Sequence, residues 1–177
     1  MAMSMYAQLP VSAFELELST GFTTPLKGYR GGESRTGMSY AAEIRYNFPR
    51  SAWDMGILVD LTNARLNFHN VVVDGYYNPE KVYRQTNRTL SIAVTTDYNF
   101  NRGNMVSSFV GLGLGIGRNK THGSVAYPTD DTSVTVIPRF GLEFFNAIRL
   151  SCQGHISRKG YNVISLNIGY TIGGRRR

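Results

Sequence analysis

The chain has 177 residues, of which 42% are hydrophobic and 18% are charged, and its 19 lysines and arginines against 12 aspartates and glutamates give a formal charge of +7. This length corresponds to one domain, and the apolar content excludes a disordered chain. The charged fraction is well below the roughly 25% usual in globular domains. Part of the surface is therefore expected not to face water, and the positive balance favours a negatively charged neighbour such as nucleic acid or lipid phosphate.

Three local features narrow the class of protein further. The single cysteine, Cys152, excludes an internal disulfide framework and an all-cysteine zinc site. The longest apolar run, 109–117, is rich in glycine and shorter than the roughly 18 residues of a membrane-spanning helix. Residues 1–8 are expected to be a signal-peptide remnant, with cleavage between Ala7 and Gln8, or else a disordered start.

Apolar and polar residues alternate with a period of two through almost the whole chain, which is the pattern of strands with one apolar face. From Met38 to Phe48 every even residue is apolar or aromatic, whereas the odd residues include Glu43 and Arg45. Each such segment is long enough for the roughly 9 to 11 residues with which a tilted strand crosses a bilayer. In chain order the predicted strands cover residues 14–22, 38–48, 53–61, 90–100, 106–116, 134–144, 148–156 and 164–172.

The connections between these strands alternate in length. Short turns are expected at 49–51, 101–104 and 146–147, and longer loops at 25–36, 69–87, 119–132 and 158–161. One rim is therefore tight and the other is looped, which is the organisation of outer-membrane barrels. The predicted fold is all-β: a closed, antiparallel, eight-stranded, up-and-down transmembrane β-barrel over residues 9–174.

A soluble barrel has the same period with its apolar face inward, so the polar face decides the orientation. Small residues fit the narrow lumen of eight strands, whereas a wall facing water carries more Lys and Glu. Aromatic side chains near the short turns predict a belt at a membrane interface. The small polar-face residues are Gly37, Ser39, Ala41, Ser91, Ala93, Thr95, Gly111, Gly113, Gly115, Gly117 and Ser151, and the aromatic ones are Phe14, Tyr46, Phe48, Trp53, Tyr98, Phe100, Phe144 and Tyr170.

With these eight segments, two kinds of connection and a closing segment at 165–172, the whole chain resembles the small eight-stranded outer-membrane β-barrel family, the OmpA/OmpX-like group. The resemblance implies the outer membrane of a Gram-negative-type cell, periplasmic termini and a basic periplasmic tail at 175–177. It also implies a structural or binding component, either a monomer or a subunit of a larger membrane complex, that contacts outer-membrane lipid and lipopolysaccharide.

Charged residues on the polar face are expected to form a network that plugs the lumen near the short turns, because charges in a narrow lumen persist only when paired or hydrated. Asp60 is a further inward acid. A small-solute or cation channel that uses the excess of acids is the alternative. The predicted network comprises Glu15, Glu17, Glu43, Arg45, Asp54, Asp97, Arg139, Glu143 and Arg149.

Basic residues gather at the looped rim, where they are expected to face lipopolysaccharide phosphates; general solvation of the loops is the alternative. No nucleic-acid-binding motif organises this charge, so no nucleic acid is expected as a partner. The lipopolysaccharide-facing candidates are Arg30, Arg35, Lys81, Arg84, Arg118, Lys120, Arg158 and Lys159.

Within the loop 69–87, β-forming residues around Asp74-Gly75 predict a hairpin above the membrane. Its Tyr76, Tyr77 and Tyr83 are candidates for an exposed surface that binds a protein partner. Packing against neighbouring loops is the alternative.

His155 and Ser157 resemble the His-x-Ser of outer-membrane lipid A deacylases, so a lipid A-modifying hydrolase is an alternative function. The last strand supplies no acidic partner, and parity turns both side chains inward, so we expect no enzyme and no catalytic residue. His69 and His122 are isolated, and Asp130-Asp131 lacks the repeat of a calcium loop. No metal and no cofactor are expected, and Cys152 is expected to face lipid.

Overall fold

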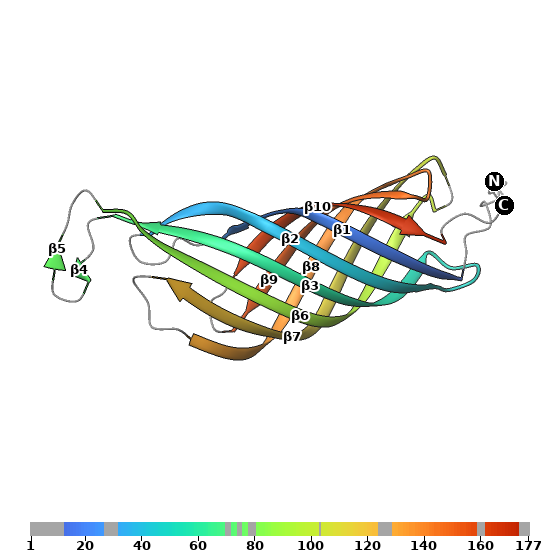
Figure 1. Cartoon of the computed structure of the whole chain (residues 1–177). Helices are drawn as coiled ribbons and strands as arrows, with labels where there is room; N and C mark the ends of the chain where they lie inside the picture. Colours follow the sequence, from blue (N-terminus) through green and yellow to red (C-terminus); the bar gives the residue numbers. More distant parts are fainter. Residues whose placement is uncertain are drawn as a thin grey trace.

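The computed structural model describes residues 13–26, 32–69, 72–73, 76–77, 81–102, 104–123, 129–158 and 162–173. These residues form a closed barrel in the order β1-β10-β9-β8-β7-β6-β3-β2, with every neighbouring pair antiparallel (Figure 1). The all-β, eight-stranded up-and-down prediction is confirmed. The barrel strands are β1 (Phe14–Pro25), β2 (Gly32–Asn47), β3 (Trp53–Phe68), β6 (Tyr83–Phe100), β7 (Val106–Gly123), β8 (Thr129–Phe144), β9 (Ile148–Ser157) and β10 (Val163–Ile172).

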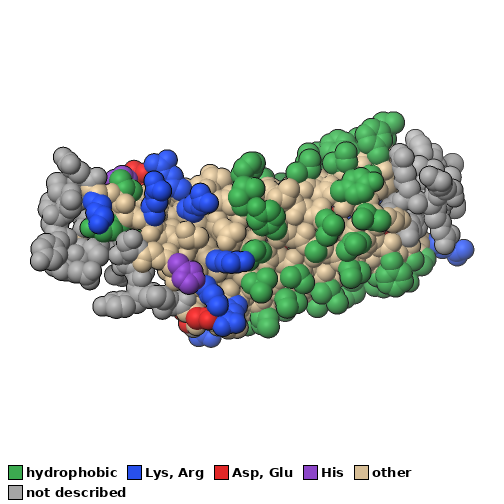
Figure 2. Space-filling view, viewed as in Figure 1, with side chains coloured by type: hydrophobic (Ala, Val, Ile, Leu, Met, Phe, Trp, Pro, Cys, Tyr) green, Lys and Arg blue, Asp and Glu red, His purple; other side chains and the backbone are tan. Residues whose placement is uncertain are grey.

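The alternation of the sequence becomes an alternation between the lumen and the outer wall. On β6, Ile92 and Val94 are 52% and 54% exposed, whereas Ser91 and Thr95 are almost completely buried. The apolar side chains therefore cover the outside of the barrel, where they form a broad band (Figure 2). No helix in the described part of the chain is long and apolar enough to span a membrane.

Aromatic rings gather at the end of the barrel that carries the short turns. β1 begins and β10 ends at this same end (Figure 1). The ring centroids of Trp53 and Tyr98 lie 5.1 Å apart, and those of Tyr98 and Phe100 lie 4.9 Å apart. Phe14 and Tyr46 form a similar pair at 5.0 Å. These edge and tilted pairs border the apolar band, as aromatic girdles of membrane barrels do.

Several strands continue farther toward the looped rim than the sequence predicted. β3 runs to Phe68 and β6 begins at Tyr83, whereas the prediction ended one strand at 61 and began the next at 90. The outward side chains of this extension are polar, as at Arg65 and Arg84. The alternation with an apolar outer face therefore inverts on β3, where inward residues such as Leu66 are apolar, and is lost on β6, where most inward residues are polar as well. The loops predicted at 25–36, 69–87 and 119–132 are correspondingly shorter.

The extension makes the rim uneven. β2, β3, β6, β7 and β8 form a tall wall of 16 to 18 residues per strand, whereas β9 and β10 have 10 residues each and β1 has 12. Beyond the tall wall lies a small hairpin of β4 (Val72–Val73) and β5 (Tyr76–Tyr77), so the predicted hairpin is confirmed (Figure 1). The expectations for residues 1–8 and 175–177 fall outside the described residues.

A charged lumen and a basic outer wall

Arg139 from β8 lies at the centre of the lumen and binds two carboxylates from other walls. Its Nη1 and Nη2 donate to the two carboxylate oxygens of Glu43 on β2, at 2.8 and 2.6 Å. Its Nε and Nη2 donate to the two oxygens of Asp97 on β6, each at 2.7 Å. All three side chains are buried, and both pairs have the two-bond geometry that makes arginine–carboxylate contacts strong.

Arg149 from β9 extends this cluster toward the short turns. It donates from Nη2 to Asp97, and it lies 3.7 Å from Glu17 and 4.0 Å from Glu143. Its guanidinium also stacks over the ring of Phe109, 3.5 Å from the centroid, which is close enough for a cation–π contact. Asp97 therefore accepts hydrogen bonds from two arginines.

Arg45 from β2 adds two further ion pairs. Its Nη2 lies 3.2 Å from Oε2 of Glu15, and its Nη1 lies 3.4 Å from Oε2 of Glu17. Together the nine residues of the predicted network all point into the lumen and are at most 9% exposed. They occupy the turn-side half of a barrel whose interior is just wide enough for side chains. The arrangement can hold the walls together and block the passage of solutes.

Arg102 belongs to the same cluster, although the sequence placed it in a turn. It lies 3.6 Å from Asp54, donates to the side chain of Asn47, and donates to the carbonyl oxygen of Ser51 at 3.1 Å. Two features of the sequence could have indicated this role: Arg102 lies in a turn next to the rim, and its side chain is long enough to reach back into the barrel.

The looped half of the lumen contains uncharged polar groups and one His–Asp contact. Nε2 of His155 lies 3.7 Å from Oδ2 of Asp60, and its Nδ1 has no hydrogen-bond partner among the described residues. The hydroxyl of Ser157 lies 2.6 Å from that of Ser133 rather than bonding His155. His155 thus has an acidic partner that the sequence did not reveal, because Asp60 comes from β3 across the barrel.

His155 and Ser157 both lie inside the barrel wall and not on the lipid side, as parity predicted. In the described ranges no group of three His, Cys, Asp or Glu side chains is placed to hold a metal ion. Cys152 lies on the outward side of β9 and is partly exposed.

Most of the predicted basic candidates at the looped rim are exposed (Figure 2). Arg118 donates from Nε and Nη2 to both carboxylate oxygens of Asp130, at 2.7 and 2.6 Å, and Lys120 lies 3.7 Å from the same residue. This pair lies beyond the apolar band, and the hydrogen bonds from Arg118 hold the pKa of the Asp130 carboxyl below its usual value. Arg35, Lys81, Arg84 and Arg158 are exposed, Lys120 is half-buried, and Arg30 and Lys159 lie outside the described residues.

Tyr83 does not belong to the exposed aromatic surface that the sequence predicted, so that part of the prediction is wrong. It is the first residue of β6 and is 6% exposed, with Phe68 of β3 as its cross-strand partner. Both residues take the inward positions of their strands, because β6 begins earlier than expected. Tyr76 and Tyr77 form β5, but the positions of their side chains lie outside what the structure describes.

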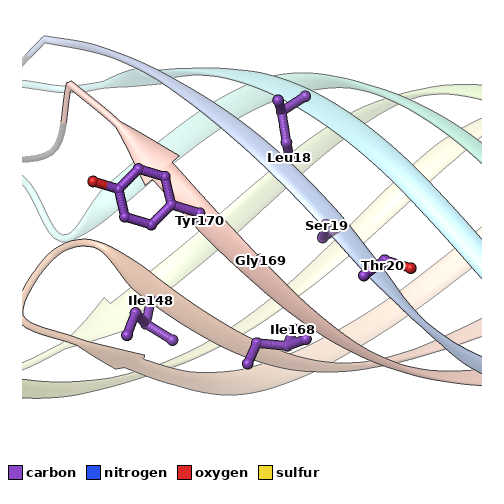
Figure 3. Close-up of a pocket in the computed structure, with 7 residues that line it drawn as sticks. All are labelled: Leu18, Ser19, Thr20, Ile148, Ile168, Gly169 and Tyr170. Atoms are coloured by element: carbon purple, nitrogen blue, oxygen red, sulfur yellow. The ribbon is translucent and has the colours of Figure 1, made fainter.

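A shallow apolar groove follows the outer wall between β1, β9 and β10 (Figure 3). The side chains of Leu18, Ile148, Ile168 and Tyr170 surround it, and it contains no charged group. It therefore forms part of the apolar band.

No protein-family model matches the chain, and no curated protein matches it in sequence. Solved structures do share the fold. Neisserial surface protein A is 14% identical with a TM-score of 0.56, over 93% of this chain and 99% of that chain. The outer membrane protein OprG from Pseudomonas aeruginosa is 10% identical with a TM-score of 0.56, over 94% and 99%. The N-terminal β-barrel domain of OprF from the same organism is 13% identical with a TM-score of 0.52, over 92% and 100%.

Proposed function

Because this chain has the fold of the small eight-stranded outer-membrane β-barrels, we propose that it is an integral outer-membrane protein with a closed lumen. It acts as a structural or binding component through its extracellular loops, with the short turns and the termini on the periplasmic side. The observation that carries this proposal is an apolar outer band around a lumen whose turn-side half is filled by paired charges. Lipid and lipopolysaccharide surround it as partners, and it acts as a monomer or as a subunit of a larger membrane complex.

The height of the apolar band supports insertion into a bilayer. On β7 the outward residues are apolar from Val110 to Ile116 and again at Val106, and Arg118 follows. The ten steps from Val106 to Ile116 extend ~33 Å along a strand and about 25 Å along the axis of a barrel with a strand tilt of ~40°. The apolar belt of outer-membrane barrels is ~25 Å tall. The two lengths agree, so the wall fits a hydrocarbon layer.

The ion pairs of the lumen favour a plug over a channel. Arg139 on β8 joins Asp97 on β6, two strands away, and Glu43 on β2, four strands away around the barrel. Separating these groups without new partners would leave buried charges, at a cost of several kcal/mol each. A pathway through this level requires that the network break, so the channel remains the disfavoured alternative.

The binding role is assigned to the hairpin at the top of the tall wall. Phe68 and Tyr83 are cross-strand partners, so a two-residue Asn-Gly turn in place of residues 69–82 can join β3 to β6 directly. The expected result is a protein that stays folded but no longer captures its cell-surface partner. Replacement of residues 159–161, in the loop between β9 and β10, serves as the matched control. Capture of the same partner after removal of 69–82 would contradict the role.

One contact in the lumen favours a second candidate function, that of a lipid A hydrolase. The contact between His155 and Asp60 supplies the acid that a hydrolase would need. However, both groups are buried inside the barrel wall, away from lipid, so hydrolysis of lipid A is the weaker proposal. Lipid mass spectra of cells with His155→Ala should match those of the parent; a change in acylation would favour the enzyme.

A further inference from the structure

A polar groove lies on the outer face of the tall wall, where β2, β3 and β6 continue beyond the apolar band. It has a volume of about 730 Å³. Three of its side chains are arginines, and none of the lining residues is acidic. The groove is lined by residues that include Arg35, Thr36, Arg65, Asn67, Arg84 and Thr86.

Strand register brings the three arginines of the groove together. Arg35 on β2 is the cross-strand partner of Arg65 on β3. Two residues farther along β3, at the next outward position, Asn67 is the cross-strand partner of Arg84 on β6. Neighbouring strands are ~4.8 Å apart, so the three backbone positions lie within about 10 Å across the sheet. All three side chains are exposed, so their guanidiniums can converge on one ligand.

The positive charge of the groove is only partly balanced. Arg35 pairs with Glu33 at 3.1 Å, but Arg65 and Arg84 have no ion-pair partner within the part of the chain that the structure describes. Arg118, on the same wall, is by contrast paired with Asp130. Like charges directly opposite each other destabilise a sheet, and an anion between them removes that cost. The groove therefore favours an anionic ligand.

The position of the groove indicates where the anion comes from. Leu61 on β3 and Leu90 on β6 are cross-strand partners at the end of the apolar band. Arg65 lies four residues beyond Leu61, ~13 Å along the strand and about 10 Å along the barrel axis. The side chains of Arg35, Arg65 and Arg84 take outward positions on their strands, so they face laterally, toward the headgroups that the proposed orientation places around this part of the wall.

We infer that Arg35, Arg65 and Arg84 form a binding site for a phosphate group on the saccharide headgroup of lipopolysaccharide. The guanidinium fork matches phosphate in two-bond geometry, which a lysine does not provide. Thr36, Asn67 and Thr86 offer hydroxyl and amide groups to the sugar beside it. The inference rests on the proposed outer-membrane orientation and adds to it a defined site, of which Arg65 was not a sequence candidate.

The test is a titration of the folded full chain in detergent with lipid A that carries both phosphates, followed by native mass spectrometry. Arg65→Gln and Arg84→Gln should each weaken binding about tenfold, because each removes charge-assisted hydrogen bonds. Arg65→Lys should weaken it less, because it keeps the charge. Arg50→Gln, which neutralises an exposed arginine in the turn between β2 and β3 at the other end of the barrel, is the matched control and should change nothing.

Two further measurements distinguish a phosphate carried by the lipid from free phosphate and from general attraction to the positive rim. Lipid A without phosphates should bind at least tenfold more weakly than the phosphorylated lipid, and inorganic phosphate at the same concentration should not displace it. Equal losses in Arg65→Gln and Arg50→Gln, equal binding of lipid A with and without phosphates, or displacement by inorganic phosphate would each overturn the site. None of these results would contradict the closed barrel or the binding role of the hairpin. The hairpin is tested by the capture experiment above, and the barrel by its gel mobility before and after boiling.

Discussion

Arg139 and Asp97 form a buried ion pair with two hydrogen bonds inside the barrel, each 2.7 Å long, although β7 separates the strands that carry them. β7 leaves room for the pair because its inward residue at this level is Gly111, the cross-strand partner of both residues. A Cβ at Gly111 would collide with the carboxylate of Asp97. Charge and side-chain volume on three adjacent strands are therefore matched at one level of the lumen.

Removal of the central guanidinium should destabilise the barrel. Arg139→Ala leaves Glu43 and Asp97 without their main partner, and breaking a buried pair costs about 3 to 5 kcal/mol. Urea unfolding of the protein in lipid vesicles measures this as a lower midpoint. Arg118→Ala, which breaks an exposed pair, is the control and should leave the midpoint nearly unchanged. Equal midpoints for Arg139→Ala and the parent would show that the network does not stabilise the fold.

The addition of a single methyl group at Gly111 tests whether the lumen has any free space at this level. Gly111→Ala should destabilise the protein by about 1 to 3 kcal/mol, because its Cβ would also lie 2.5 Å from the carbonyl oxygen of Thr96. Gly154→Ala is the matched control, since the nearest atom to its Cβ is Cγ of Pro138 at 3.5 Å. The same unfolding assay compares the two variants. A larger effect at Gly154 would mean that the inner wall is not packed as described.

The sequence was sufficient to predict the barrel because apolar outward residues and polar inward residues alternate along each strand where the wall meets lipid. The same reasoning missed Arg65 and misplaced Tyr83, because beyond the band the alternation inverts on β3, where Leu66 and its inward neighbours are apolar, and is lost on β6. It also missed the Asp60–His155 contact. Alternation fixes the face of a residue, whereas a contact across the lumen depends on the stagger of strands that are distant in the chain.

Conductance provides a test of the plugged lumen. The parent protein in a planar bilayer should produce no single-channel steps, because Arg139, Arg149 and Arg45 with their carboxylates fill the turn-side half of the interior. A larger porin added to the same membrane serves as the positive control. Regular steps from the parent that change in size with Glu43→Gln would favour the channel instead.

Trp53 is the only tryptophan of the chain and reports the depth of the aromatic belt. It is 49% exposed and packs against Tyr98 at the turn-side edge of the apolar band. In bilayers with brominated lipids, bromines near the headgroup should quench its fluorescence more than bromines near the tail ends. Trp53→Phe with Leu112→Trp moves the probe to the middle of the band and should reverse the order. Stronger tail-end quenching of Trp53 itself would contradict the belt.

Gel mobility after insertion into lipid vesicles tests most directly whether this chain folds as a closed barrel in a membrane. Unboiled protein should migrate at a different position from boiled protein, because the closed hydrogen-bonded barrel resists the detergent until it is heated. Identical positions before and after boiling, for protein recovered from the vesicle fraction, would contradict the account.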